Sequence, residues 1–178
     1  MYPKRSIIKD KKGAIVSTEF ALLLPIMVVL WAGIVEFTNM QNASRKTNLV
    51  AQSIADVIAG SQAVDDQSLN NMLRAGALIM APYRANNLTI GIQSIEADGD
   101  GNLTVGWTFG NPGDPPAIAA GLARPNFSTI HVVANYTYVP VLGGLIVGLL
   151  PEANIPNALV MTEEAFAKPR LTTIIPRN

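Results

Sequence analysis

Residues 20–35 read FALLLPIMVVLWAGIV, a run without a charged side chain that is bounded by Glu19 and Glu36. Weaker apolar character extends over residues 14–40, and a helix of that length crosses the ~30 Å hydrocarbon core of a bilayer. The sequence therefore predicts one transmembrane helix over residues 14–40. A cleaved secretory signal is the alternative, but the run exceeds the roughly 7–15 residues of a signal and no clean small-x-small site follows it.

Pro25 lies inside this predicted helix. Proline lacks the backbone N–H and collides with the preceding turn, so we expect a bend or a locally loosened helix at this residue. Membrane helices tolerate such a proline because neighbouring helices can bond to the freed backbone groups.

The first thirteen residues are basic. They contain Lys4, Arg5, Lys9, Lys11 and Lys12 against the single acid Asp10. Because positive flanks stay in the cytoplasm, residues 1–13 are predicted to be a basic cytoplasmic leader, and the C-terminal part is predicted to cross the membrane.

The composition excludes several classes of protein. The chain has 178 residues, zero formal net charge and no cysteine. A neutral chain offers no overall attraction to nucleic acid, so we expect no nucleic-acid partner. The absence of cysteine excludes a disulfide scaffold, thiolate metal sites and cysteine catalysis.

Two amphipathic helices are predicted over residues 41–82. In the first, which continues the membrane helix to Gly60, apolar residues recur at three- and four-residue spacings; they are Leu49, Val50, Ile54, Val57 and Ile58. The second begins near Asp65 and Asp66, which can cap it, and ends before Pro82. Its apolar stripe is expected to be core and comprises Leu69, Met72, Leu73, Leu78 and Ile79.

Residues 83–178 are predicted to be rich in β-strands. Apolar and polar residues alternate near 88–93, 103–109 and 130–138, and a less regular strand is expected near 158–166. The acidic turn at 98–102 (DGDGN) predicts a hairpin between the first two strands. The predicted fold class is therefore α+β: a single transmembrane helix extended by an amphipathic helix, a second helix and a small antiparallel sheet.

Residues 141–150 (VLGGLIVGLL) form a second apolar stretch, between Pro140 and Pro151. Ten residues are too few to span a bilayer as a helix. A core segment is the simpler interpretation. An exposed apolar ridge that meets the membrane surface or a neighbouring subunit is the alternative.

We expect no enzyme, no metal site and no cofactor. Asp98, Asp100 and Asn102 resemble the start of a calcium loop, but Leu103 and Phe109 replace the required glycine and glutamate. His131 is the only histidine and lies in a predicted strand, so it is not expected to be catalytic.

The N-terminal motif resembles a known family. Lys-Lys-Gly at 11–13, Glu-Phe-Ala-Leu from Glu19, Pro25 in the apolar run and a second Glu-Phe at Glu36 are similar to the TadE/TadG-like family, pilin-like proteins of tight-adherence (Flp-type) pilus and secretion systems. The TadE-like segment extends to about residue 55.

This resemblance implies cleavage by a prepilin peptidase on the cytoplasmic side, at Gly13 or Ala14. The family pattern has four residues between the glycine and the glutamate, and this chain has five. Cleavage after Gly13 would make Glu19 the sixth mature residue, and cleavage after Ala14 would make it the fifth.

Glu19 and Phe20 are the predicted register and assembly residues. A carboxylate at the start of a membrane helix can neutralise the new α-amino group of a neighbouring processed subunit, and this pairing would set the axial register. A headgroup-level carboxylate that reaches water is the alternative. Glu36 lies at the far end of the run, where water is expected to solvate it.

The resemblance implies a minor pseudopilin of a tight-adherence pilus, single-pass in the bacterial inner membrane with a periplasmic C-terminal region, and possible incorporation into the pilus. Its implied partners are a prepilin peptidase, other pilin-like subunits, the inner-membrane pilus platform and membrane lipid. The alternative is an uncleaved, single-pass envelope protein whose periplasmic domain binds a partner or surface.

Overall fold

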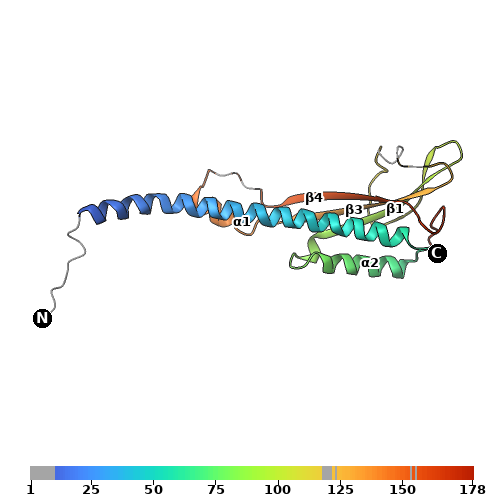
Figure 1. Cartoon of the computed structure of the whole chain (residues 1–178), viewed down its shortest axis with the longest axis horizontal. Helices are drawn as coiled ribbons and strands as arrows, with labels where there is room; N and C mark the ends of the chain where they lie inside the picture. The colour runs from blue at the N-terminus through green and yellow to red at the C-terminus, as the bar shows by residue number, and fades with distance from the viewer. Residues whose placement is uncertain (1–10, 118–121, 123, 153, 155) are drawn as a thin grey trace. The chain divides into compact units, whose positions relative to one another are not determined.

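The computed structural model describes residues 11–117, 122, 124–152, 154 and 156–178, with side chains in the first helix from residue 17 onward. The elements are, in order, α1 (Lys11–Ala59), α2 (Asp66–Ile79), the 3₁₀ turn η2 (Ala85–Asn87), β1 (Leu88–Ala97), β2 (Leu103–Phe109), β3 (Ser128–Tyr138), α4 (Gly143–Leu149) and β4 (Leu159–Ala167) (Figure 1). The predicted α+β class, with a long apolar N-terminal helix and a small antiparallel sheet, is confirmed.

The described chain divides into two compact units. The helix unit contains α1 up to Asn39 together with Pro140–Asn157, and the sheet unit contains Met40–Val139 together with Ala158–Asn178. α1 contributes its apolar first half to one unit and its amphipathic second half to the other.

The sheet has four antiparallel strands in the order β2-β1-β3-β4. β1 and β2 form the predicted hairpin, and their register shifts between Ser94 and Ile95. β3 pairs with both β1 and β4. All four predicted strands are therefore present, and the least regular one, β4, is an edge strand of the sheet.

The core of the sheet unit lies between the two helices and one face of the sheet (Figure 1). From α1 it includes Val50, Ile54 and Ile58, all at most 3% exposed. Its fully buried members on the other elements include Leu69, Met80, Ile92, Ile130 and Val132. Side chains return to the same face every 3.6 residues along a helix and every second residue along a strand. These repeats place the core residues of each element on the face that meets the other elements.

Three apolar residues of the predicted amphipathic helices are exposed, and for one of them, Leu78, the expectation of a core position is wrong. Leu49 is 51% exposed, Val57 53% and Leu78 79%. Leu78 follows Leu69 by nine residues, which is half a turn out of phase at 100° per residue, so the two point in opposite directions. Leu49 and Val57 each precede a buried residue and lie beside the buried stripe.

α2 begins as the sequence predicts. The Asp65 carboxylate accepts the Ser68 backbone N–H at 2.7 Å, and the Ser68 hydroxyl accepts the Asp65 N–H at 3.1 Å. These bonds satisfy two backbone N–H groups that have no acceptor within the helix, those of Asp65 and Ser68. The bond from the Ser68 backbone, followed by that from its side chain, lowers the pKa of Asp65.

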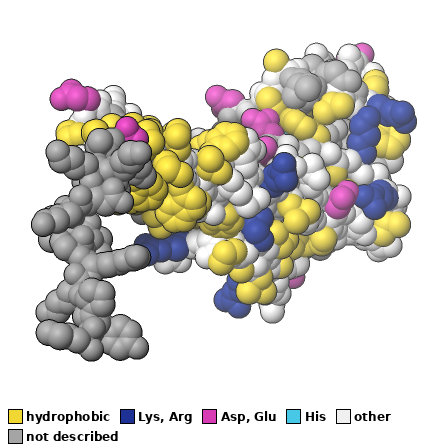
Figure 2. All heavy atoms as spheres, turned by 60° about the vertical axis from the view of Figure 1, so that its left-hand side comes forward, with side chains coloured by type: hydrophobic (Ala, Val, Ile, Leu, Met, Phe, Trp, Pro, Cys, Tyr) yellow, Lys and Arg dark blue, Asp and Glu magenta, His cyan; other side chains and the backbone are white. Residues whose placement is uncertain are grey.

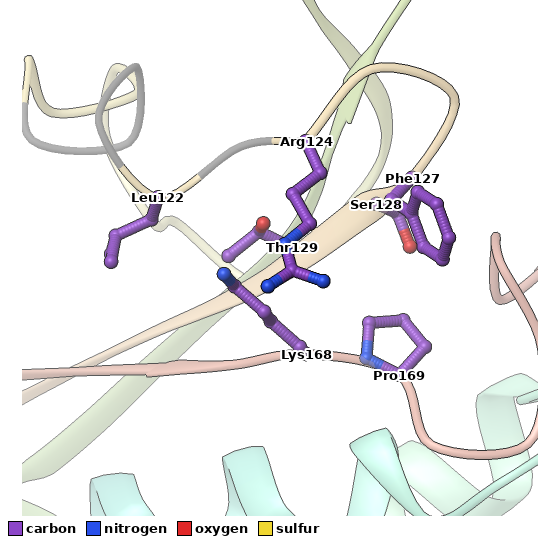
Figure 3. A pocket seen from close by; sticks show the side chains of 7 residues that line it. All are labelled: Leu122, Arg124, Phe127, Ser128, Thr129, Lys168 and Pro169. Atoms are coloured by element: carbon purple, nitrogen blue, oxygen red, sulfur yellow. The ribbon is translucent and has the colours of Figure 1, made fainter.

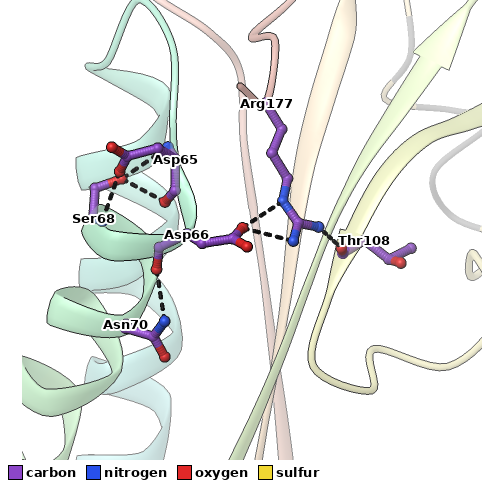
Figure 4. Close-up of polar contacts among 6 residues, drawn as sticks. All are labelled: Asp65, Asp66, Ser68, Asn70, Thr108 and Arg177. Carbon is purple, nitrogen blue, oxygen red and sulfur yellow. Dashed lines mark hydrogen bonds and ion pairs between the residues drawn. The ribbon is translucent and has the colours of Figure 1, made fainter.

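The C-terminal tail is bound to α2 and β2. Arg177 donates to the Asp66 carboxylate at 2.9 and 2.7 Å and to the Thr108 carbonyl (Figure 4). Its guanidinium also lies 5.4 Å from the centre of the Phe109 ring. The neighbouring backbone is paired as well, since the Val64 N–H donates to the Pro176 carbonyl at 3.0 Å. The tail is thereby an integral part of the sheet unit.

The core interpretation of residues 141–150 is wrong. The segment forms the short helix α4, and five of its apolar side chains are at least 39% exposed: Val141, Leu145, Val147, Leu149 and Leu150. The segment belongs to the same compact unit as the first half of α1. Its apolar residues therefore enlarge an exposed apolar surface.

Candidate functional site

The principal candidate site is the exposed apolar surface of the first half of α1. Ten large side chains there are each at least 45% exposed: Phe20, Leu22, Leu23, Leu24, Ile26, Met27, Leu30, Trp31, Ile34 and Phe37. Figure 2 shows hydrophobic side chains gathered on the part of the molecule that comes forward in that view. An extended exposed apolar surface marks a site of contact with a membrane or with another protein.

Length and composition fit a membrane span. Among the described residues, one helix is long and apolar enough to cross a membrane, within Ser17–Ala59, and 6% of its most apolar window is buried. A core helix of a globular protein would bury most of its apolar side chains. Here the apolar side chains are already directed outward, as contact with lipid or with neighbouring helices requires.

The predicted site residues all lie on α1. Gly13 and Ala14 lie in its first turn, where the structure describes the backbone, whereas residues 1–10 of the predicted leader lie outside the described residues. Glu19 and Phe20 are exposed on the helix surface, where neighbouring chains or lipid can reach them. Pro25 lies inside α1, which is assigned as helix on both sides of it.

Glu36 has a role that the sequence did not indicate. Its Oε1 accepts the Val141 N–H and its Oε2 accepts the Leu142 N–H, both at 2.9 Å. The carboxylate therefore binds the start of the 141–150 segment directly, and the expectation of a merely solvated acid is incomplete. The partners are separated by about a hundred residues, so no local pattern could have revealed the contact.

A polar cluster on the sheet joins the buried side chains of Gln93 and His131 to the exposed Glu164. Gln93 and His131 are directly paired on β1 and β3, and the Gln93 amide lies 2.8 Å from His131 Nδ1. His131 Nε2 lies 3.2 Å from Glu164 Oε2, and its ring stacks on Phe166. Burial lowers the pKa of His131, and the hydrogen bond and charge of Glu164 only partly oppose this.

This cluster is consistent with a structural role. A neutral imidazole with the proton on Nε2 donates to Glu164 and accepts from the Gln93 amide, which satisfies both ring nitrogens. Neither Gln93 nor Glu164 is a nucleophile of the kind that a histidine base activates. The expectation that His131 is not catalytic is therefore compatible with the partners of its ring.

A small pocket lies beside β3 and the end of β4. It has a volume of about 120 Å³ and is lined by Leu122, Arg124, Phe127, Ser128, Thr129, Lys168 and Pro169. Figure 3 shows the Arg124 guanidinium and the Lys168 amine pointing toward one another. This lining suits a small anionic group. It does not select one ligand, and we assign no function to it.

In the acidic turn at 98–102, the Asp98 carboxylate binds the backbone of the turn itself. Asp98 Oδ1 accepts the backbone N–H groups of Asp100 and Asn102 at 3.0 and 2.8 Å. Hydrogen bonds from Asn102, first its side chain and then its backbone, lower the pKa of Asp98. In the part of the chain that the structure describes, no group of three or more histidine or acidic side chains is placed to hold a metal ion.

Comparison with known proteins confirms the resemblance carried by the N-terminal motif. Residues 14–56 match the family model described as TadE-like protein. The match begins one residue after Gly13, covers the exposed apolar half of α1 and continues into the amphipathic half. No curated protein and no solved structure matches the chain.

Proposed function

We propose that this protein, whose residues 14–56 match the TadE-like family, is a pilin-like, single-pass membrane component of a tight-adherence pilus assembly system. The TadE-like family is a pilus-associated structural family. The single observation that carries the proposal is the coincidence of this segment with the exposed apolar half of α1. A subunit of this kind acts by packing its helix against others, without chemistry of its own.

The orientation follows from the charge distribution. The basic residues of the first twelve positions keep the N-terminus in the cytoplasm, and the sheet unit then lies on the periplasmic side of the inner membrane. There it can meet other pilin-like subunits and the assembly platform.

Processing prepares the helix for assembly. A prepilin peptidase would cut at Gly13 or Ala14, remove the basic leader and leave a free α-amino group at the start of the span. This cation lies at the edge of hydrocarbon, where burying it alone is costly.

Glu19 supplies the complementary charge. Its carboxylate lies one to two helical turns beyond the new terminus, at the same edge of the membrane, and it is exposed toward neighbours. The α-amino group of one subunit and Glu19 of the next form a charge-assisted hydrogen-bonded pair, which is far less costly in hydrocarbon than either ion alone. Because the pair forms at only one axial offset, it fixes the register of adjacent helices.

The experiment is substitution of Glu19 in cells that make the pilus. Glu19→Ala should insert into the membrane, since it only makes the span more apolar, and should fail to enter the assembly. Glu19→Asp, which keeps the charge, is the matched control and should retain much of the incorporation. Incorporation of Glu19→Ala at the wild-type level would show that the residue is only a headgroup-level carboxylate.

An uncleaved envelope protein is the second candidate. Five residues rather than four separate Gly13 from Glu19, and this departure from the family pattern favours an intact leader. In that case the span is only an anchor, and the sheet unit binds a partner or surface. The N-terminal sequence of the protein from cells distinguishes the two candidates.

A further inference from the structure

The apolar segment 141–150 carries an inference beyond anchorage by α1. The segment contains no polar side chain, and its α4 helix exposes Leu145 and Val147 by 42% and 39%. Val141, just before α4, is 75% exposed. A loop of a water-soluble domain would not present so continuous an apolar surface.

The segment is tied to the membrane helix through Glu36. Both carboxylate oxygens of Glu36 accept backbone N–H groups, those of Val141 and Leu142, at 2.9 Å. These donors directly precede α4, and the N-cap residue Leu142 has no side-chain cap of its own. An N–H group without an acceptor is costly to bury away from water, and the Glu36 carboxylate accepts both of these groups.

One face of α1 is shielded on the N-terminal side of Glu36. Ala32, one turn before Glu36, is fully buried, and Val28 and Val29, about a turn earlier, are only partly exposed. Figure 1 shows α4, in orange, beside α1 within this unit. α4 therefore lies beside the apolar part of α1.

We propose that residues 141–150 insert into the membrane leaflet at the Glu36 end of the span, as a second, non-spanning membrane contact held beside α1 by the Glu36 carboxylate. The proposal rests on the membrane-spanning role of α1. The seven residues of α4 rise about 10 Å, which fits within one leaflet of a core about 30 Å thick.

Lipid is the occupant that the surroundings favour. The exposed side chains of α4 lie in the same compact unit as the exposed apolar side chains of the α1 span, and those of the span already require lipid or other helices. The backbone polar groups of the segment can be buried in hydrocarbon, because α4 is helical and the N–H groups of Val141 and Leu142 are bonded to Glu36. Polar residues return directly after the segment, at Glu152 and Asn154, where the chain would re-enter the headgroup region.

The chain has no cysteine, so single cysteines can carry an environment-sensitive fluorophore on the full-length protein in vesicles. Leu145→Cys reports on α4, Leu22→Cys on the span, and Leu78→Cys, in α2 and 79% exposed, is the matched aqueous control. Lipids brominated on their acyl chains are the quencher. We expect blue-shifted emission and quenching at positions 145 and 22, and neither at 78.

The outcomes separate this inference from the proposed function. Quenching at position 22 without quenching at 145 would overturn the inserted segment and leave the membrane anchor standing. An absence of quenching at 22 would overturn the anchor itself. Blue-shifted emission at 145 that is not quenched by lipid, and that weakens when the protein is diluted in the bilayer, would show that a second copy covers α4 and would also overturn the proposal.

Substitution of Glu36 tests the attachment. Glu36→Ala leaves the N–H groups of Val141 and Leu142 without their acceptor, so the label at position 145 should lose most of its quenching. The label at position 22 should be unchanged, because the span does not depend on Glu36. Undiminished quenching at 145 in Glu36→Ala would contradict the role of Glu36 in holding the segment.

Discussion

The two halves of α1 treat apolar side chains in opposite ways. In the helix unit, Leu22 is 73% and Leu30 63% exposed, whereas in the sheet unit Val50 and Ile58 are fully buried. Only the second half has a sheet and a second helix against which to pack. An apolar stripe becomes a core where other elements cover it and a membrane or assembly surface where they do not, and helix propensity does not distinguish the two cases.

The largest expected effect is on membrane insertion, when a charge is placed in the first half of α1 and compared with a charge in the second half. Ile26→Lys should raise the apparent free energy of membrane insertion by about 3–4 kcal/mol, because the ammonium must enter hydrocarbon and a favourable isoleucine is lost. Leu49→Lys changes a residue that is similarly exposed on the same helix, and it should leave insertion unchanged. An insertion assay on the full-length chain measures both. Equal effects would remove the distinction between the halves.

The next effect tests how closely the sheet unit is packed. A Cβ on Gly91 would lie 2.3 Å from the Pro112 backbone nitrogen, so Gly91→Ala should lower the free energy of unfolding by about 1–3 kcal/mol. Gly99→Ala is the control, since its Cβ would meet only Asn126 Oδ1 at 3.8 Å. Chemical denaturation of the detergent-solubilised protein should separate the two variants, and equal stabilities would contradict the close approach of Pro112 to β1.

A smaller effect is expected at the C-terminal tail. Arg177→Met removes the bonds to Asp66 and Thr108 and should lower the free energy of unfolding by about 1 kcal/mol. Arg170→Met breaks the ion pair with Asp56, whose two side chains are 63% and 64% exposed, and should cost less than about 0.5 kcal/mol. A larger loss of unfolding free energy in Arg170→Met than in Arg177→Met, in the same denaturation experiment, would contradict the stabilising role of Arg177 in the tail.

The smallest effect is a dependence of stability on pH. Burial lowers the pKa of His131 in the folded protein below its ordinary value of 6.5. The unfolded chain therefore takes up the proton at higher pH, and the stability present above 6.5 declines as the pH falls below it. His131→Gln should show a shallower decline of melting temperature between neutral and mildly acidic pH. An unchanged slope would exclude His131 as the source.

Local patterns in the sequence predicted much of this architecture. The uncharged run predicted the exposed half of α1, and Asp65 predicted the start of α2. Alternation predicted β1, β2 and β3, and β4 was expected from a less regular pattern. The motif from Glu19 to Glu36 predicted the family to which residues 14–56 are matched. Each of these features depends on neighbouring residues, whose spacing is visible in the chain.

The remaining features depend on contacts between distant residues. Exposure of Leu78 reflects which side of α2 meets α1, and the environment of His131 is set by Gln93 and Glu164 on other strands. Glu36 binds the N–H groups before α4, and backbone donors have no sequence signature. Spacing cannot identify such partners, so these parts of the site required the structure.

In the proposed function, the chain is processed in front of the α1 span and then assembles through that helix. The N-terminal sequence of the protein, recovered from cells with and without a matching prepilin peptidase, tests it most directly. We expect a mature chain that begins at Ala14 or Ile15 only when the peptidase is present. A chain that retains its basic leader in pilus-producing cells, or that begins after Ala32 or Ala43 as an ordinary secretory protein would, contradicts it.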